Sequence, residues 1–147
     1  MLDKSHIGRT WPSHSVLVEA GRLRFFAKAI GETSPVYVDE AAAKRAGYRS
    51  LPVPPTFLFS LELERPAPFE WLAFLGVDLA RILHGEQRFV YHRPACAGDL
   101  LTFESRITDI SDKKQGALEF ITRETRVRNQ AGEHVADLTS VIIQRNA

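Results

Sequence analysis

Hydrophobic positions follow two different periods along the chain, and the change of period divides it into two halves. In the N-terminal half, apolar residues recur at helical spacing over residues 20–30, which predicts a helix that ends at Gly31. Alternation over residues 15–19 predicts a short strand before it. Residues 39–46 predict a second, shorter helix, with Asp39 as its N-cap and Gly47 as its terminator.

A third helix is expected to be buried. The segment TFLFSLELE, residues 56–64, is apolar on most sides, and Pro52, Pro54 and Pro55 exclude regular structure before it. A proline is favoured at the start of a helix, because its missing N–H would have no partner there. Residues 66–83 predict a loop with an amphipathic turn or helix that carries Trp71 and Phe74.

The C-terminal half alternates with the period of a strand. Residues 87–92, 101–110, 117–128 and 134–145 each predict a strand, and Asn129–Gly132 indicates a tight turn. One early strand, a buried helix and four antiparallel strands predict an α+β fold, in which a curved antiparallel sheet wraps around a central helix. Such a sheet leaves an edge strand exposed, and dimerisation can cover it.

Composition narrows the class of protein. A chain of 147 residues that is 44% hydrophobic and 25% charged is predicted to be one globular domain, residues 1–147. Its 19 basic and 18 acidic residues favour no nucleic-acid partner. No apolar run reaches the roughly 18 residues of a membrane span, and residues 1–13 lack the apolar core of a signal peptide, so we expect a cytoplasmic protein without a membrane partner.

No metal or other cofactor is expected from the sequence. The single cysteine, Cys96, excludes an intrachain disulfide and a multi-cysteine metal site. His6, His14 and His134 stand alone near the ends of the chain or a turn, and nothing in the sequence arranges them as ligands.

The segment FAKAIGETSPVYVDEAAAKRAGYRSLPVPPTF, Phe26–Phe57, resembles the substrate-site segment of the MaoC-like (R)-specific enoyl-CoA hydratases and dehydratases. In that family it reads roughly Phe-Ala-x-x-x-Gly-Asp-x-x-Pro-x-His-x-Asp, followed by a small-residue helix and a His-Gly pair at the mouth of a buried helix. The resemblance extends from about Ile7 to Arg145 and implies a single hot-dog fold. It is strongest to fatty-acid-synthase-type dehydratase domains, in which a degenerate hot dog pairs with a competent one.

The resemblance implies a catalytic site whose residues are changed. Glu32 stands in place of the family's catalytic Asp, and Tyr37 in place of its catalytic His. A tyrosine is a poor base at neutral pH, because its ordinary pKa is about 10. Pro55 stands in place of the glycine whose N–H holds the thioester oxygen, and proline has no N–H to donate. Thr56 or Phe57 could donate from further along the chain, but in a different register. Alternatively, Glu32 only ends a helix and Tyr37 only fills the vacated pocket.

Two further groups are candidates for the site. His84 and Glu86 are two residues apart, so we expect them on one strand face, either as a surrogate acid/base pair or as part of a structural hydrogen-bond network. Arg88 and Arg93 are candidates for the phosphates of coenzyme A or phosphopantetheine, although the His92-Arg93-Pro94 motif also fits a simple turn.

From these residues we expect the substrate-holding, catalytically degenerate subunit of an (R)-specific 2-enoyl-CoA/ACP hydratase or 3-hydroxyacyl dehydratase. Its ligand would be an acyl-CoA or acyl-carrier-protein thioester, and its partner a second copy or a catalytically intact MaoC-like subunit. Two alternatives remain: a homodimeric hydratase that uses His84 and Glu86, and a non-catalytic acyl-thioester binding module. The expected substrate-binding residues are Pro55, Thr56, Phe57, Phe59, Trp71 and Phe74, the last four as the lining of an acyl tunnel.

Overall fold

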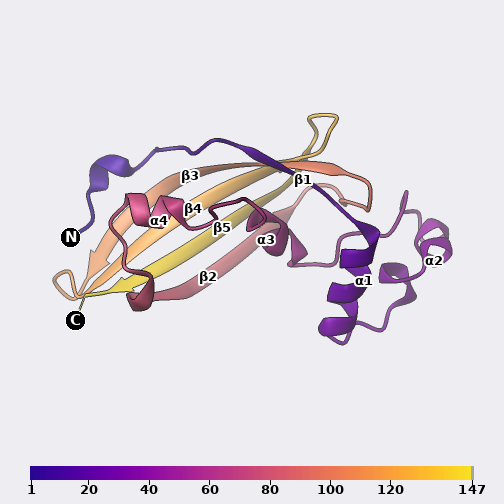
Figure 1. Ribbon diagram of the computed structural model, residues 1–147, viewed down its shortest axis with the longest axis horizontal. Helices are drawn as coiled ribbons and strands as arrows, with labels where there is room; N and C mark the ends of the chain where they lie inside the picture. Colours follow the sequence, from indigo (N-terminus) through magenta and orange to yellow (C-terminus); the bar gives the residue numbers. More distant parts are fainter. Residues whose placement is uncertain (147) are drawn as a thin grey trace.

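The computed structural model describes residues 1–146, which form one five-stranded antiparallel sheet and a set of short helices (Figure 1). The order of strands across the sheet is β1-β3-β4-β5-β2, so β1 and β2 are its edges. The strands are β1 His14–Leu17, β2 Ile82–Tyr91, β3 Leu100–Lys113, β4 Leu118–Arg128 and β5 His134–Arg145. The helices are α1 Ala20–Ala29, α2 Glu40–Arg45, α3 Phe57–Glu62 and α4 Glu70–Phe74, with 3-10 turns at Lys4–His6, Pro35–Tyr37 and Leu79–Arg81.

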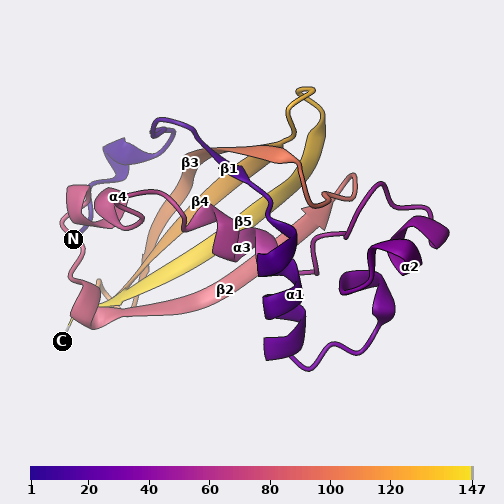
Figure 2. The same ribbon diagram turned by 45° about the vertical axis from the view of Figure 1, so that its right-hand side comes forward.

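The long strands curve around α3, which lies against one face of the sheet, here called the inner face (Figures 1 and 2). Phe57, Leu58 and Leu61 of this helix are buried in a cluster with Phe103 and Leu138 of the sheet. The other face of the sheet, the outer face, carries charged side chains at alternate positions. The arrangement confirms the expected hot-dog fold, with the predicted helix at its centre.

Most predicted elements lie where the sequence placed them. The N-cap at Asp39 is confirmed, because its carboxylate accepts hydrogen bonds from the N–H groups of Ala41 and Ala42. Two strands are longer than expected: β2 already begins at Ile82, and β3 continues to Lys113 because Lys113 pairs with Leu118 across the turn.

A row of polar residues crosses the inner face and divides the core into two apolar clusters. Its centre is a buried ion pair, in which Arg123 of β4 donates to the carboxylate of Glu62 at the end of α3 over 2.7 Å. Thr125 also donates to that carboxylate, and the Arg123 guanidinium lies 4.6 Å from the centre of the Trp71 ring. This network ties α3 to the middle of the sheet.

The loop between β2 and β3 is fixed by Asp99, which is 1% exposed. Its carboxylate accepts hydrogen bonds from Arg49 at 2.8 Å and 3.0 Å, from the Cys96 N–H at 2.8 Å and from Gln130 at 3.1 Å. Burial acts to raise the pKa of Asp99, but these hydrogen bonds and the charge of Arg49 outweigh it and lower the pKa.

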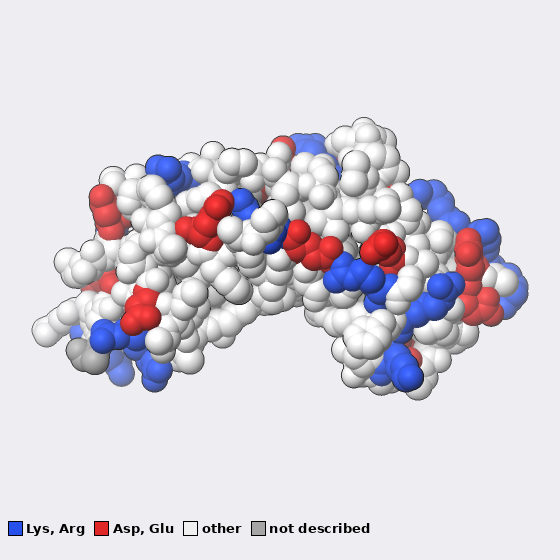
Figure 3. Space-filling view, in the orientation of Figure 1, with Lys and Arg blue, Asp and Glu red and all other residues white. Residues whose placement is uncertain are grey.

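Charges of both signs lie interspersed over the face drawn in Figure 3, with several cationic groups at the end formed by α1 and α2. This distribution agrees with the net charge of +1. No helix among the described residues is long and apolar enough to cross a membrane.

Candidate functional site

All three tyrosines of the chain line one pocket of about 250 Å³. Tyr37 belongs to the turn after α1, Tyr48 follows α2, and Tyr91 ends β2. The remaining walls come mainly from the proline-rich segment before α3 and from the loop after β2: Pro52, Val53, Pro55, Leu58, Arg93, Pro94, Ala95 and Val135. The structure therefore brings Tyr37 and Pro55 together, as the resemblance to the hydratases implies.

The N-cap residue of α3, Thr56, has unusual backbone dihedral angles. Thr56 has φ = 75° and ψ = −19°, in the left-handed region that glycine adopts without cost and a β-branched residue adopts only under strain. Its N–H donates a hydrogen bond to the Tyr91 hydroxyl over 2.9 Å. The helix mouth thus retains a backbone donor at Thr56, one residue after Pro55, but a phenol of the same chain occupies it.

Glu32 and Tyr37, which the resemblance aligns with the family's catalytic Asp and His, lie close enough to interact. Burial raises the pKa of Tyr37, and the neighbouring Tyr48, Glu32 and Tyr91 raise it further. Tyr37 therefore stays neutral and cannot serve as a base at physiological pH. The Glu32 carboxylate accepts a hydrogen bond from the Ser34 N–H over 2.8 Å, which closes the turn behind α1. In the single chain, this pair shapes a turn and a pocket wall.

The four expected tunnel residues do not lie together. Phe57 packs in the first core cluster, with its ring 4.6 Å from that of Phe26, whereas Trp71 is buried in the second cluster. Phe59 lies with its ring 5.1 Å from His84, and Phe74 is 47% exposed. Their role in binding an acyl chain therefore remains a prediction.

His84 and Glu86 do not share a strand face. The pairing of β2 with β5 slips between them: His84 lies opposite Ile142, and Glu86 lies opposite Val141. Because neighbouring residues of β5 face opposite sides, this β-bulge turns His84 to the inner face and Glu86 to the outer face. The predicted shared face is wrong, since Gly85 between them is an extra residue that the two-residue period does not count.

The two arginines that were candidates for phosphate binding, Arg88 and Arg93, line two different depressions. Arg88 is paired with Glu86, and it lines a depression on the outer face of the sheet. Arg93 lines the tyrosine pocket and pairs with Glu133 over 3.2 Å. Of the two, only Arg93 lies where it could meet a ligand in that pocket.

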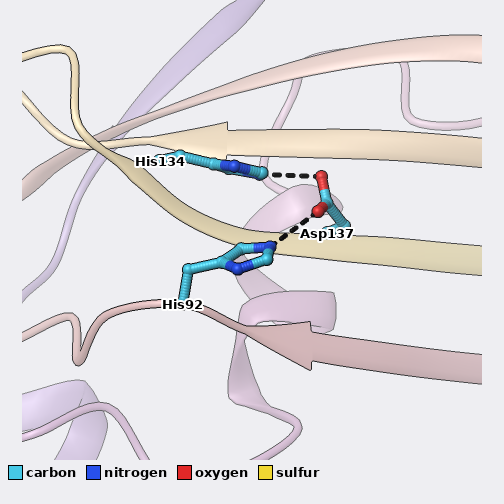
Figure 4. Close-up of side chains that lie close together, drawn as sticks. All are labelled: His92, His134 and Asp137. Carbon is cyan, nitrogen blue, oxygen red and sulfur yellow. Dashed lines mark hydrogen bonds and ion pairs between the residues drawn. The ribbon is translucent and has the colours of Figure 1, made fainter.

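A second polar group, which sequence reasoning missed, lies near the end of β2. His92, His134 and Asp137 point toward one another (Figure 4), although the sequence suggested that His134 stands alone. The signal in the sequence is weak, because His92 comes from the segment after β2 and the other two residues from β5.

The sequence matches a known family model and curated relatives. The family model described as "FAS1-like, dehydratase domain region" matches residues 5–138. The chain belongs to this dehydratase-region family. A UPF0336 protein of Streptomyces avermitilis is 38% identical to this family member over 148 residues, which cover 99% of this chain and 97% of the relative.

Solved structures place this dehydratase-region protein among the MaoC-like hot dogs. A chain of the C-terminally truncated HadBC (3R-hydroxyacyl-ACP dehydratase) complex of Mycobacterium tuberculosis is 28% identical, with a TM-score of 0.77 and coverage of 94% of this chain and 96% of that one. A MaoC-like dehydratase is 27% identical, with a TM-score of 0.84 over 97% of this chain and 43% of the other. These findings confirm the resemblance to MaoC-like proteins and indicate a protein of the hydratase/dehydratase type.

Proposed function

We propose that this protein is the substrate-holding subunit of an (R)-specific 2-enoyl thioester hydratase or 3-hydroxyacyl thioester dehydratase, and that a second MaoC-like chain supplies the catalytic Asp and His. The observation that carries the proposal is the tyrosine pocket. In this pocket, Tyr37, a neutral side chain, stands where the family has its catalytic His. The backbone N–H of Thr56 beside it already donates a hydrogen bond to the Tyr91 hydroxyl.

The pocket suits binding better than proton transfer. Hydration of an enoyl thioester needs an ionisable group that takes a proton from water, and such a group works best with a pKa near the operating pH. The three phenols offer hydrogen bonds and flat apolar surfaces instead. A thioester oxygen that enters the pocket could displace the Tyr91 hydroxyl and accept the Thr56 N–H, the kind of backbone donor that steadies a thioester oxygen.

A partner chain fits the exposed edge of the sheet. Within residues 1–146, the edge strand β2 has a strand neighbour on one side only, and its side chains Leu83, Val90 and Tyr91 are each about half exposed. Tyr91 belongs both to this edge and to the tyrosine pocket. A second hot dog that pairs with β2 would therefore bring its own residues close to the pocket, and the HadBC dehydratase is itself described as a complex.

The alternative of a homodimer that uses His84 and Glu86 has less support. The β-bulge sends these side chains to opposite faces, and each has a local partner: His84 Nε2 contacts the Glu86 carbonyl at 3.1 Å, and Glu86 pairs with Arg88. A surrogate acid/base pair would require both side chains to reach the reacting atoms of one bound substrate.

The direct test is hydration of crotonyl-CoA by the pure chain and by the chain co-expressed with MaoC-like chains of the same genome that keep the Asp and His. The proposal expects turnover only in the complex, and loss of that turnover when the partner's Asp or His is replaced. Turnover by the pure chain would refute the division of labour. Tight binding of crotonyl-CoA without turnover in any complex would instead indicate a binding module.

A further inference from the structure

We propose that His92, His134 and Asp137 form a binding site for a divalent transition-metal ion such as Zn²⁺. The site lies on the outer side of the sheet, and the proposed thioester chemistry does not use it. Two imidazole nitrogens and a carboxylate oxygen are a donor set that zinc and its neighbours in the first transition series prefer in proteins.

The three ligand atoms already converge. His92 Nε2 lies 2.8 Å from one carboxylate oxygen of Asp137, and His134 Nε2 lies 2.8 Å from the other. The two imidazole rings have their centres 4.1 Å apart, and all three ligand atoms lie within 4.8 Å of one another (Figure 4). Ligands of a tetrahedral zinc ion at about 2.1 Å lie about 3.4 Å apart, a spacing between the 2.8 Å nitrogen–oxygen distances and the 4.8 Å limit within which the three ligand atoms lie.

The backbone holds the three residues in place, which matters because metal affinity depends on ligands that need little rearrangement. His92 is bound directly to β5, since its N–H donates to the Val135 carbonyl over 2.8 Å. His134 and Asp137 are three residues apart, an odd number that would put them on opposite faces of a regular strand. A slip in the pairing of β4 with β5 inserts Val135 as an extra residue and turns both side chains to the same side.

The charge of the cluster is also suitable. Asp137 contributes a carboxylate, which is an anion at neutral pH and so offsets part of the charge of a divalent ion. A neutral imidazole whose proton is on Nδ1 presents the lone pair of Nε2, so in that tautomer each ring could bind the ion through Nε2 without loss of a proton. The competing cation is Arg126, whose Nε lies 3.9 Å from Asp137; its side chain is 53% exposed, which leaves it room to turn away.

The test is calorimetric titration of the tag-free, chelator-treated chain with ZnCl₂, together with the visible spectrum of the Co²⁺-loaded chain. We expect saturable binding of one ion per chain and a Co²⁺ spectrum of low coordination number. His134→Ala and Asp137→Asn are each expected to weaken zinc binding by at least about tenfold, since even groups behind the ligands change metal affinity by about 10–100-fold.

The matched control is His6→Ala, which removes one histidine at a distance from the cluster, where its ring packs on Phe74, and is expected to bind as the parent does. Asp137→Asn keeps the shape of the side chain, so it serves where His134→Ala does not fold; circular dichroism establishes the fold of each variant. Absence of saturable binding by the parent chain would overturn the proposal. So would equal zinc affinity in the parent, His134→Ala and Asp137→Asn chains.

Discussion

Replacing Arg123 with methionine removes the cation from the ion pair that ties α3 to the sheet. In the parent chain the Arg123 and Glu62 side chains are 6% and 3% exposed, and their charged atoms lie 2.7 Å apart. Arg123→Met keeps an unbranched side chain against Trp71 but leaves the Glu62 carboxylate buried with Thr125 as its remaining partner. Breaking a buried pair on one side costs about 3–5 kcal/mol, because an uncompensated charge stays inside the protein.

The assay is urea unfolding followed by circular dichroism. With a dependence on urea of about 1–3 kcal/mol per molar, the Arg123→Met chain should unfold at a urea concentration about 1–5 M lower than the parent. Replacing both partners, Glu62→Leu with Arg123→Met, should recover most of the loss, since removal of a whole buried pair is often neutral or stabilising. The matched control is Arg106→Met: Arg106 pairs with Glu124 over 3.3 Å, but the side chains are 62% and 46% exposed, so we expect a loss of at most about 1 kcal/mol.

Two results would refute this reasoning. One is a loss in Arg123→Met no larger than that in Arg106→Met. The other is a double variant that loses the sum of its single changes, because the two groups would then contribute independently.

Three further outcomes are expected. Thr56→Gly should leave the free energy of unfolding unchanged or raise it by up to about 1 kcal/mol, because relief of the left-handed strain at φ = 75° exceeds the entropy cost of glycine; a loss above that size in urea unfolding would contradict it. Asp99→Asn should make the free energy of unfolding less sensitive to acid. Because folding lowers the pKa of Asp99, the stabilisation by its carboxylate is complete above the unfolded value of 3.8 and is lost as the pH falls below it. The free energies of unfolding of parent and variant should therefore converge in acid. Restoring Glu32→Asp, Tyr37→His and Pro55→Gly together should raise crotonyl-CoA hydration more than the product of the single changes, since residues that act as a unit are non-additive.

The order of elements could be predicted because it is encoded locally. The change from a helical period to an alternating one marks the boundary between the two halves, and Asp39 signals its helix by a local hydrogen bond. The slip at Gly85 was missed, although an isolated glycine next to a strand pattern is a signal for a bulge, because the predicted alternation began only at residue 87. The inward position of Arg123 could not be predicted, since its partner Glu62 lies 61 residues away in the chain.

The candidate site could likewise be predicted only in part. The proximity of Tyr37 and Pro55 could be predicted from the resemblance to the hydratases, because the whole segment between them matches the family; both residues line one pocket. Tyr48 and Tyr91 were missed as pocket residues, since they come from a loop and a strand end that only the tertiary structure brings together. The shift of the backbone donor from Pro55 to Thr56 became visible only in the backbone dihedral angles.

The central claim is that this chain holds a thioester substrate and depends on a partner for catalysis. Its most direct test is the rate of crotonyl-CoA hydration by the purified chain alone, compared with the rate of the complex with an intact MaoC-like chain. We predict no measurable turnover by the chain alone, and in the complex a rate that falls by about 10²–10⁴-fold when the partner's catalytic His is replaced. Brisk turnover by the chain alone, abolished by His84→Ala, would contradict it and place the catalytic group on β2 of this protein.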